Sequence, residues 1–185
     1  RNGVLRMDED FNFRIFYADP SVADTDTPLE RRELCRWIDL PLCAPDYIDT
    51  NLAPETVLSR AHLLHDRNAQ PWSDWLRAAG VEYDVDPNNG TVFNETSLGL
   101  SAAIAHAGIV IGDSFLALQH IRDGMLVPPF PLGLRSRDAY MLCRRLGREH
   151  SPAERAFEDW IQQALSSYMA EVEGLLAWTN VRIAK

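Results

Sequence analysis

The middle of the chain reads Phe93-Asn94-Glu95-Thr96-Ser97-Leu98-Gly99-Leu100-Ser101-Ala102-Ala103-Ile104-Ala105-His106-Ala107-Gly108-Ile109-Val110-Ile111-Gly112, and it contains the clearest structural signals in the sequence. Thr96 and Ser97 favour the N-cap of a helix, so a helix is predicted from about Ser97 to Ala107, ending at Gly108. A short strand is predicted before it, at 91–94. The apolar run 109–111 between two glycines is typical of a buried parallel strand. This order predicts an α/β fold with a mostly parallel sheet covered by helices.

The segments on both sides carry the same kind of helix punctuation. Pro71 near the start and Gly80 at the end of 71–80 predict a helix between them. Downstream, Asp113 is a suitable N-cap for a helix over 114–123 that ends at Gly124.

The two ends of the chain give a strand, an extended segment and a long helix. Alternating apolar residues at 11–17 predict a strand that ends in a turn at 18–21. Residues 34–44 read as extended, but Pro41 and Pro45 favour a connector or an edge strand over a central strand. Ser151-Pro152-Ala153-Glu154 is a capping box that begins a long amphipathic helix. Its buried stripe is predicted to contain Phe157, Trp160, Ile161, Ala164, Leu165, Tyr168 and Val172.

Composition is that of a globular protein, and charge argues against nucleic-acid binding by this chain alone. Of 185 residues, 46% are hydrophobic and 24% are charged, which is ordinary for a globular protein. No apolar run reaches the roughly 18 residues that a membrane helix needs, and the first residues lack the features of a secretory signal.

The net charge is −9, whereas phosphate recognition needs a basic face. Cys35, Cys43 and Cys143 fit buried free thiols in a reducing cytoplasm.

An ordered set of segments resembles the effector-sensing domain of LysR-type transcriptional regulators. Residues 93–112 are similar to the second-lobe signature of that family, and Leu63-Leu64-His65 with 72–80 resemble its branch of glycine-cleavage and β-lactamase activators. Three further segments match in order, namely Pro41-Leu42-Cys43-Ala44-Pro45-Asp46-Tyr47, Ile121-Arg122-Asp123-Gly124-Met125-Leu126-Val127-Pro128-Pro129-Phe130 and Tyr140-Met141-Leu142-Cys143. Ala156-Phe157-Glu158-Asp159-Trp160-Ile161 resembles the closing helix of the family.

The resemblance implies an α/β, periplasmic-binding-protein-like (type II) fold of two lobes joined by two crossover strands. The first lobe would comprise 1–41 and 138–185, and the second lobe 42–137. Because the family's domain usually opens with a strand, a helix and a strand before the position of Phe11, the first lobe is expected to be truncated at its N-terminal side. Residues 166–185 lie beyond the ordinary end of the domain.

The implied function is effector sensing and oligomerisation in a DNA-binding transcription regulator. A small-molecule effector would bind between the lobes, two or four copies would associate, and DNA would be bound only through a helix-turn-helix domain that this chain lacks. The resemblance implies a cytoplasmic protein with no membrane partner, no cofactor and no enzymatic activity. A free-standing small-solute-binding protein of the same fold is the alternative, and a secretory signal in the parent gene would favour it.

Candidate effector contacts lie at predicted helix starts and strand ends. A helix that starts at Thr96 or Ser97 directs backbone N–H groups outward, which suits a carboxylate or a similar anion, and Asn94 adjoins it. Tyr17 and Asp19 follow a first-lobe strand, where α/β sheets commonly bind ligands. Asp19 before Pro20 also reads as a turn residue, Thr96 as a helix cap, and Asp113, at another strand end, as the cap of the next helix.

Metal-binding and catalytic patterns are weak. Asp84, Asp86, Asn88 and Glu95 fall at EF-hand-like positions, but Asn89 replaces the required glycine and Pro87 stiffens the loop. His62 and His65 lack further ligands nearby in sequence. Neither a nucleophile elbow nor a phosphate-binding loop is present, so no metal ligand or catalytic residue is predicted.

Overall fold

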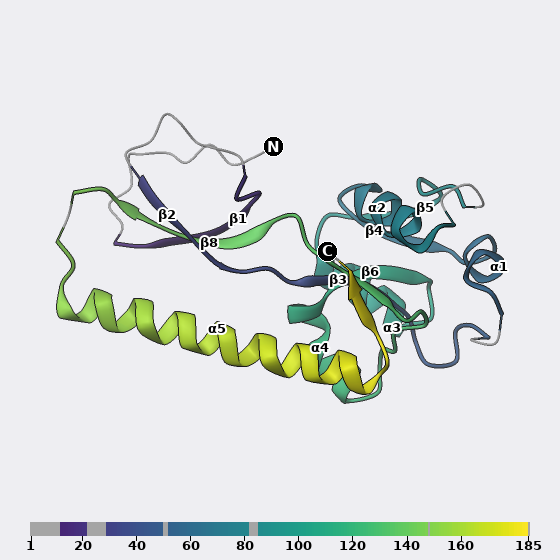
Figure 1. Cartoon of the computed structure of the whole chain (residues 1–185). Helices are drawn as coiled ribbons and strands as arrows, with labels where there is room; N and C mark the ends of the chain where they lie inside the picture. Colours follow the sequence, from purple (N-terminus) through teal and green to yellow (C-terminus); the bar gives the residue numbers. More distant parts are fainter. Residues whose placement is uncertain (1–11, 22–28, 50–51, 82–84, 148, 185) are drawn as a thin grey trace. The chain divides into compact units, whose positions relative to one another are not determined.

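The computed structural model describes residues 12–21, 29–49, 52–81, 85–147 and 149–184, which divide into two compact units (Figure 1). Unit 1 comprises Arg1–Arg36 and Ser136–Glu171, and unit 2 comprises Trp37–Arg135 and Val172–Lys185. The chain therefore passes from one unit to the other three times. The predicted limits of the two effector-binding lobes, near residues 41 and 138, stay a prediction.

Unit 1 contains an antiparallel three-stranded sheet. Its strands are β1 (Arg14–Ala18), β8 (Ala139–Arg145) and β2 (Leu29–Cys35), in the order β1-β8-β2. The predicted strand at 11–17 therefore begins at Arg14 within the described residues, and Phe11 lies outside them. β8 occupies the centre because it pairs with both other strands.

The long helix α5 (Pro152–Trp178) begins in unit 1 with the predicted capping box. The Ser151 amide donates to Glu154 Oε2 at 2.7 Å, and the Glu154 amide donates to Ser151 Oγ at 3.2 Å. The predicted stripe is only partly correct. Val172 is buried, but Ala164 is exposed and Trp160 is 60% exposed. A spacing of three to four residues admits neighbours on the edge of a stripe, and Trp160 lies beyond that edge.

Unit 2 is built on a six-stranded mixed sheet in the order β5-β4-β6-β3-β7-β9. The pairs β4–β5, β4–β6 and β7–β9 are parallel, whereas β3 is antiparallel to both β6 and β7. The sheet of unit 2 is therefore mostly parallel, as predicted. The strands are β3 (Ile38–Leu42), β4 (Leu63–Asp66), β5 (Gly90–Phe93), β6 (Ile109–Asp113), β7 (Leu132–Arg135) and β9 (Arg182–Ala184). The helices are α1 (Pro54–Leu58), α2 (Gln70–Ala79), α3 (Thr96–Ile104) and α4 (Ser114–Arg122).

Strand β3 contradicts the edge-strand prediction for residues 34–44. The extended segment is split into β2 and β3, and β3 lies inside the sheet between β6 and β7. Pro41 is tolerated there because β7 pairs only with Ile38 and Asp39. The missing N–H of Pro41 therefore costs no ladder bond on the β7 side.

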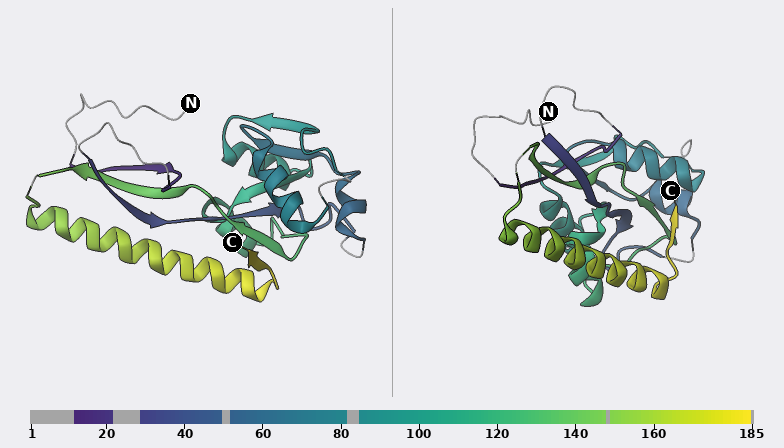
Figure 2. Two further views of the ribbon diagram at one scale, coloured as in Figure 1. Left: turned by 45° about the horizontal axis from the view of Figure 1, so that its top comes forward. Right: turned by 60° about the vertical axis from the view of Figure 1, so that its left-hand side comes forward.

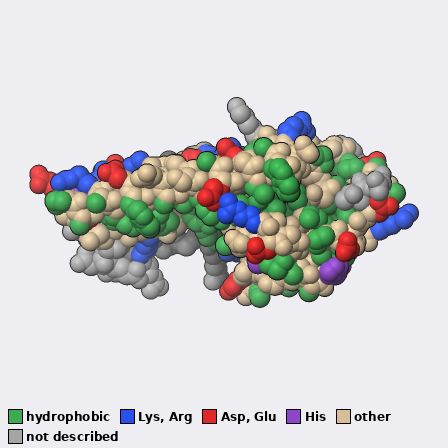
Figure 3. All heavy atoms as spheres, turned by 90° about the horizontal axis from the view of Figure 1, so that it is seen from below, with side chains coloured by type: hydrophobic (Ala, Val, Ile, Leu, Met, Phe, Trp, Pro, Cys, Tyr) green, Lys and Arg blue, Asp and Glu red, His purple; other side chains and the backbone are tan. Residues whose placement is uncertain are grey.

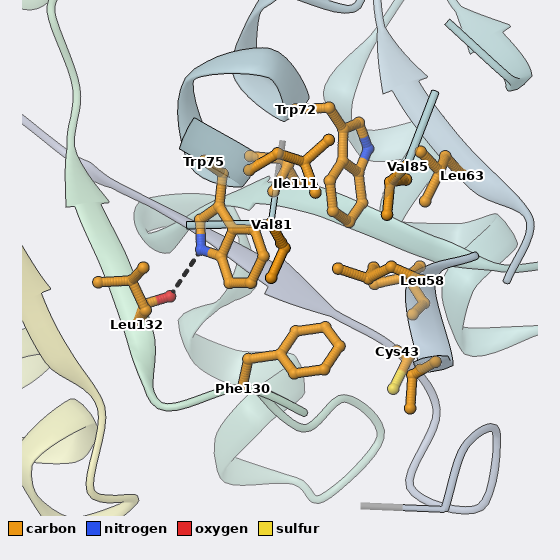
Figure 4. Packing of buried hydrophobic residues seen from close by; sticks show 13 residues of the cluster. Cys43, Leu58, Leu63, Trp72, Trp75, Val81, Val85, Ile111, Phe130 and Leu132 are labelled. Atoms are coloured by element: carbon orange, nitrogen blue, oxygen red, sulfur yellow. Dashed lines mark hydrogen bonds between the residues drawn. The ribbon is translucent and has the colours of Figure 1, made fainter. Parts of the chain in front are cut away.

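The core of unit 2 is centred on the two tryptophans of α2, Trp72 and Trp75, each 1% exposed (Figure 4). Trp72 Nε1 donates to the backbone oxygen of Leu64 at 3.1 Å, and Trp75 Nε1 donates to that of Leu132 at 2.9 Å. Two indole groups thus attach one helix to β4 and to β7. The predicted helix at 71–80 is confirmed, and it ends at Gly80, whose φ is 76°.

The C-terminal residues from Val172 onward complete unit 2. Val172, Leu176 and Val181 are buried, and β9 extends the sheet beside β7. No helix within the described residues is both long and apolar enough to cross a membrane.

Candidate functional site

Three strands of unit 2 end at the same edge of its sheet. β4 ends at Asp66, β5 at Phe93 and β6 at Asp113. Because β5, β4 and β6 are mutually parallel, their carboxyl ends point the same way. This edge is where open α/β sheets bind ligands.

Helix α3 begins at this edge, and its start differs from the predicted cap. Glu95 is the N-cap, with no hydrogen bond from its side chain, and Thr96 is the first helical residue. Thr96 Oγ1 donates to Asp66 Oδ2 at 2.5 Å. The Thr96 hydroxyl therefore ties α3 to the end of β4 instead of capping α3. Asn94 and Ser97 are exposed beside it.

Asp66 and Arg67 belong to this edge but were not predicted. Arg67 has a φ of 64°, a left-handed value that is uncommon outside glycine, and its amide donates to the backbone oxygen of Phe93 at 2.8 Å. Arg67 Nε lies 3.6 Å from Asp66 Oδ1, an oxygen that is buried and accepts no hydrogen bond from the described residues. The one signal in the sequence is the position of Asp66 directly after Leu63-Leu64-His65.

Asp113 has the predicted capping role at the start of α4. Its Oδ1 accepts a hydrogen bond from the Phe115 amide at 2.6 Å. Burial raises the pKa of Asp113 to about 6, and the charge of Asp66 acts in the same direction, against the backbone hydrogen bonds from Phe115 and Leu116. Two carboxyl groups thus interact at this edge, and one of them takes up a proton near pH 6.

Replacing Asp113 by asparagine is expected to change the pH dependence of stability. Because the folded state binds this proton more tightly than the unfolded state, the stabilisation is full below about pH 4 and is lost as pH rises to about 6. Asparagine keeps a capping oxygen without the charge. Between pH 4 and pH 7 the free energy of unfolding of the variant should therefore rise by roughly 2 kcal/mol relative to that of the parent.

Urea unfolding of both proteins at pH 4 and pH 7 measures this difference. The exposed Asp123→Asn is the control. A difference between Asp113→Asn and the parent that is the same at both pH values contradicts the prediction.

The remaining candidates, Tyr17 and Asp19, belong to unit 1. Tyr17 is half exposed. Asp19 Oδ1 accepts hydrogen bonds from the Ser21 hydroxyl at 2.6 Å and the Ser21 amide at 2.8 Å, and these bonds lower the pKa of Asp19. Asp19 thus forms a turn with Ser21, which is the turn role that the sequence also allowed.

The weak metal-binding patterns find little support in the described part of the chain. Asp84 lies outside it, and Asp86 Oδ1 accepts a hydrogen bond from the Asn88 amide at 2.9 Å. His62 Nε2 lies 2.8 Å from the Thr91 hydroxyl oxygen. Within the described residues no three His, Cys, Asp or Glu side chains gather as a metal site. Cys43 and Cys143 are buried thiols, as predicted, and Cys35 is a half-buried thiol. Burial raises the pKa of the Cys43 thiol to about 12.

Sequence comparison supplies the family. The profile described as "LysR substrate binding domain" matches residues 7–166. The chain belongs to the LysR substrate-binding domain family. This LysR domain has the effector-binding role within a family of transcriptional regulators, which confirms the predicted recognition, the effector-binding function and the assignment to a non-enzymatic class.

Individual relatives agree with this assignment and with the resembled branch. The HTH-type transcriptional regulator DsdC of Escherichia coli K12 is 28% identical over 138 residues, which are 69% of this chain and 43% of that protein. The glycine cleavage system transcriptional activator of the same strain is 28% identical over 124 residues, 66% of this chain and 40% of that protein. This LysR domain therefore spans under half the length of these relatives.

Solved structures confirm the fold. The effector binding domain of AmpR from Citrobacter freundii superimposes with a TM-score of 0.69 at 23% identity, covering 84% of this chain and 75% of that one. The mixed α/β fold of the LysR domain is accordingly periplasmic-binding-protein-like, as predicted.

Proposed function

We propose that this LysR domain binds a small effector carrying a carboxylate or a similar anion at the carboxyl edge of β5, β4 and β6. The observation that carries the proposal is the start of α3. Its N-cap contributes no side-chain hydrogen bond, so the first backbone N–H groups of the helix are not capped by that residue. Helix starts of this kind favour anions. Asn94, Thr96 and Ser97 are the proposed contacts.

Two neighbouring groups support an anion site at this edge. Arg67 is half exposed and provides a permanent positive charge, in a left-handed backbone conformation that costs energy and recurs at ligand sites. The Asp66 carboxylate holds the Thr96 hydroxyl proton, so the Thr96 oxygen stays an acceptor for a ligand N–H or O–H. An effector with both an acidic and a donor group fits this set.

We extend the proposal to the whole regulator. Tyr17, Asp19 and Asp113 would add contacts to an effector bound between the two lobes, with limits near residues 41 and 138. Effector binding would favour one lobe arrangement by no more than its difference in affinity for the two arrangements. The parent protein would be a cytoplasmic homodimer or tetramer that binds DNA through a helix-turn-helix domain outside this chain. The name of the related DsdC, an HTH-type transcriptional regulator, supports the helix-turn-helix part of this proposal.

A thermal-shift screen tests the binding site. The domain is screened against amino acids, small carboxylates, aromatic acids and cell-wall fragments. A saturating ligand at about 100 times its Kd should raise the melting temperature by about 5 °C or more. The double variant Thr96→Ala with Ser97→Ala should lose this rise.

The matched control is Ser101→Ala, an exposed serine on the same helix away from its start; it should keep the full rise. A ligand whose effect survives the double variant would place the site elsewhere. If neither this chain nor the full-length parent responds to any compound of the panel, the proposed effector class is wrong.

A further inference from the structure

The dipeptide Asn89-Gly90 lies at the start of β5. In such a dipeptide the backbone nitrogen of the glycine can attack Cγ of the asparagine side chain, because glycine has no Cβ to obstruct the approach. Ammonia leaves, and a cyclic succinimide forms. Water then opens the ring at one of its two carbonyl groups and gives either aspartate or isoaspartate, whose main chain contains one more carbon. The reaction needs a free asparagine side chain and a free glycine N–H.

The side chain of Asn89 meets the first requirement. Asn88 and Asn89 are both exposed, but they differ in their partners. The amide and Nδ2 of Asn88 donate to Asp86 Oδ1 at 2.9 and 3.2 Å. Within the described residues, Asn89 forms hydrogen bonds through its backbone alone: its amide donates to the Asp86 backbone oxygen at 3.2 Å, and its own oxygen lies 3.3 Å from His65 Nε2. Its side-chain amide can therefore turn toward Gly90.

The N–H of Gly90 points away from the neighbouring strand. β5 is the end strand of its sheet and pairs only with β4 among the described strands, and Figure 2 shows it at the rim of unit 2. The Arg67 amide donates to the backbone oxygen of Phe93, so Phe93 directs its backbone groups toward β4. Successive residues of a strand direct these groups to opposite sides. The N–H of Thr91 therefore also faces β4, and that of Gly90 faces the open side of β5.

The buried His65 increases the reactivity of this nitrogen. Its side chain is 2% exposed, and its Nε2 lies within hydrogen-bond distance of the Asn89 oxygen. Because a carbonyl oxygen only accepts, the ring nitrogen must donate. A donor on this oxygen polarises the peptide group between Asn89 and Gly90 and makes its N–H more acidic. The deprotonated nitrogen is the form that attacks the side chain.

The fold requires glycine at position 90. Gly90 has a φ of 148°, and a Cβ there would lie 1.9 Å from the backbone oxygen of Leu63. Any other residue type would push β5 away from β4. The reactive dipeptide thus follows from the close approach of two strands, and only a change of Asn89 can remove it.

We propose that Asn89 is a site of spontaneous deamidation in the folded domain, and that its isoaspartate product loosens β5 from β4. The additional main-chain carbon displaces the Asn89 oxygen, which His65 Nε2 of β4 binds. The new charge is the smaller disturbance, because exposed acidic side chains are ordinary on this molecule, as the face in Figure 3 shows. The inference involves neither an effector nor a second copy of the chain, so it is independent of the proposed function.

The dipeptide Asp123-Gly124 supplies a protected counterpart at the end of α4. The Gly124 amide donates to the backbone oxygen of Ile121 at 3.1 Å, and Asp123 Oδ1 accepts from Gln119 Nε2 at 2.8 Å. Both groups that would have to react are thus occupied. Asp123→Asn places an Asn-Gly dipeptide in this setting and keeps an oxygen for Gln119, so it is the matched control.

Peptide mapping by mass spectrometry of the Asp123→Asn chain, incubated in mildly alkaline buffer, measures both sites in one sample. Asn89 should lose its amide at least about 10-fold faster than position 123, where the Gly124 hydrogen bond must first break. In guanidinium chloride the two rates should become similar. The dipeptide Asn2-Gly3 lies outside the described residues, and positions 2, 89 and 123 fall in different tryptic peptides. Equal rates in the folded chain, or an Asn89 that stays intact, would overturn the proposal.

The melting temperature tests the effect on β5. The parent chain, incubated until isoaspartate has formed at position 89, should melt about 2–4 °C below the fresh chain. Asn89→Gln should keep its melting temperature through the same incubation, because the longer side chain closes a ring far more slowly. Fresh Asn89→Asp, which adds the charge without the carbon, should melt within about 1 °C of the fresh parent. An isoaspartate-containing chain that melts like the fresh parent overturns the loosening of β5.

Discussion

Replacing Trp75 by alanine is expected to lower the free energy of unfolding of unit 2 by about 3–5 kcal/mol. Trp75 is 1% exposed, and its ring packs on Phe130 with ring centroids 5.3 Å apart (Figure 4). The substitution leaves a cavity and removes the partner of the Leu132 carbonyl, which accepts from Trp75 Nε1 at 2.9 Å. A buried carbonyl without a donor adds to the cost.

Urea unfolding followed by circular dichroism measures this effect, and two variants separate its causes. Trp75→Phe keeps most of the ring packing but removes the donor, so its loss should be about 1–3 kcal/mol. Trp178→Ala removes the same side chain at an 80% exposed position and should change stability by less than about 0.5 kcal/mol. Similar losses in Trp75→Ala and Trp178→Ala would contradict the position of Trp75 in the core.

The parts of the fold that could be predicted from sequence are those set by local chemistry. The capping box at Ser151, the Asp113 cap and the Gly80 end each depend on residues within one helical turn. The short run between Gly108 and Gly112 likewise indicated strand β6. Such signals stay readable because the groups that satisfy one another are adjacent in the chain.

The misread parts depend on residues far apart in sequence. The edge-strand prediction for Pro41 failed because nothing local shows that β7 pairs only with Ile38 and Asp39. Thr96 was read as a cap, whereas its partner, Asp66, lies thirty positions earlier. Trp160 was assigned to the buried stripe because spacing alone does not show how wide a face is covered.

The candidate site shows the same division between local and distant information. Helix starts and strand ends pointed to Asn94, Thr96, Ser97 and Asp113. Asp66 and Arg67 needed the parallel pairing of β4 with β5, which places the end of one strand beside the end of the other. The residue type gives no sign of the left-handed φ of Arg67, because arginine rarely adopts such a value.

Replacing Gly108 by alanine is expected to destabilise unit 2 by about 3 kcal/mol or more. A Cβ at this position would lie 2.2 Å from the backbone oxygen of His62 and 3.0 Å from Leu64 Cγ. The His62 oxygen cannot move away freely, because it accepts the Ile109 amide at 2.9 Å. The new methyl group must therefore separate β6 from β4 at the start of their parallel pairing. Loss of stability is measured by urea unfolding.

Gly174→Ala is the matched control, because the same methyl group is added where nothing lies within 4 Å. There it should stabilise α5 by roughly 0.5–1 kcal/mol, as alanine is the better helix former. One substitution is thus expected to act with opposite signs at two glycines. The sign of the change in stability depends on whether another backbone lies beside the glycine, as it does at Gly108 but not at Gly174. Equal, small changes in stability at both positions would show that β4 and β6 do not approach as closely at Gly108 as the structure has them.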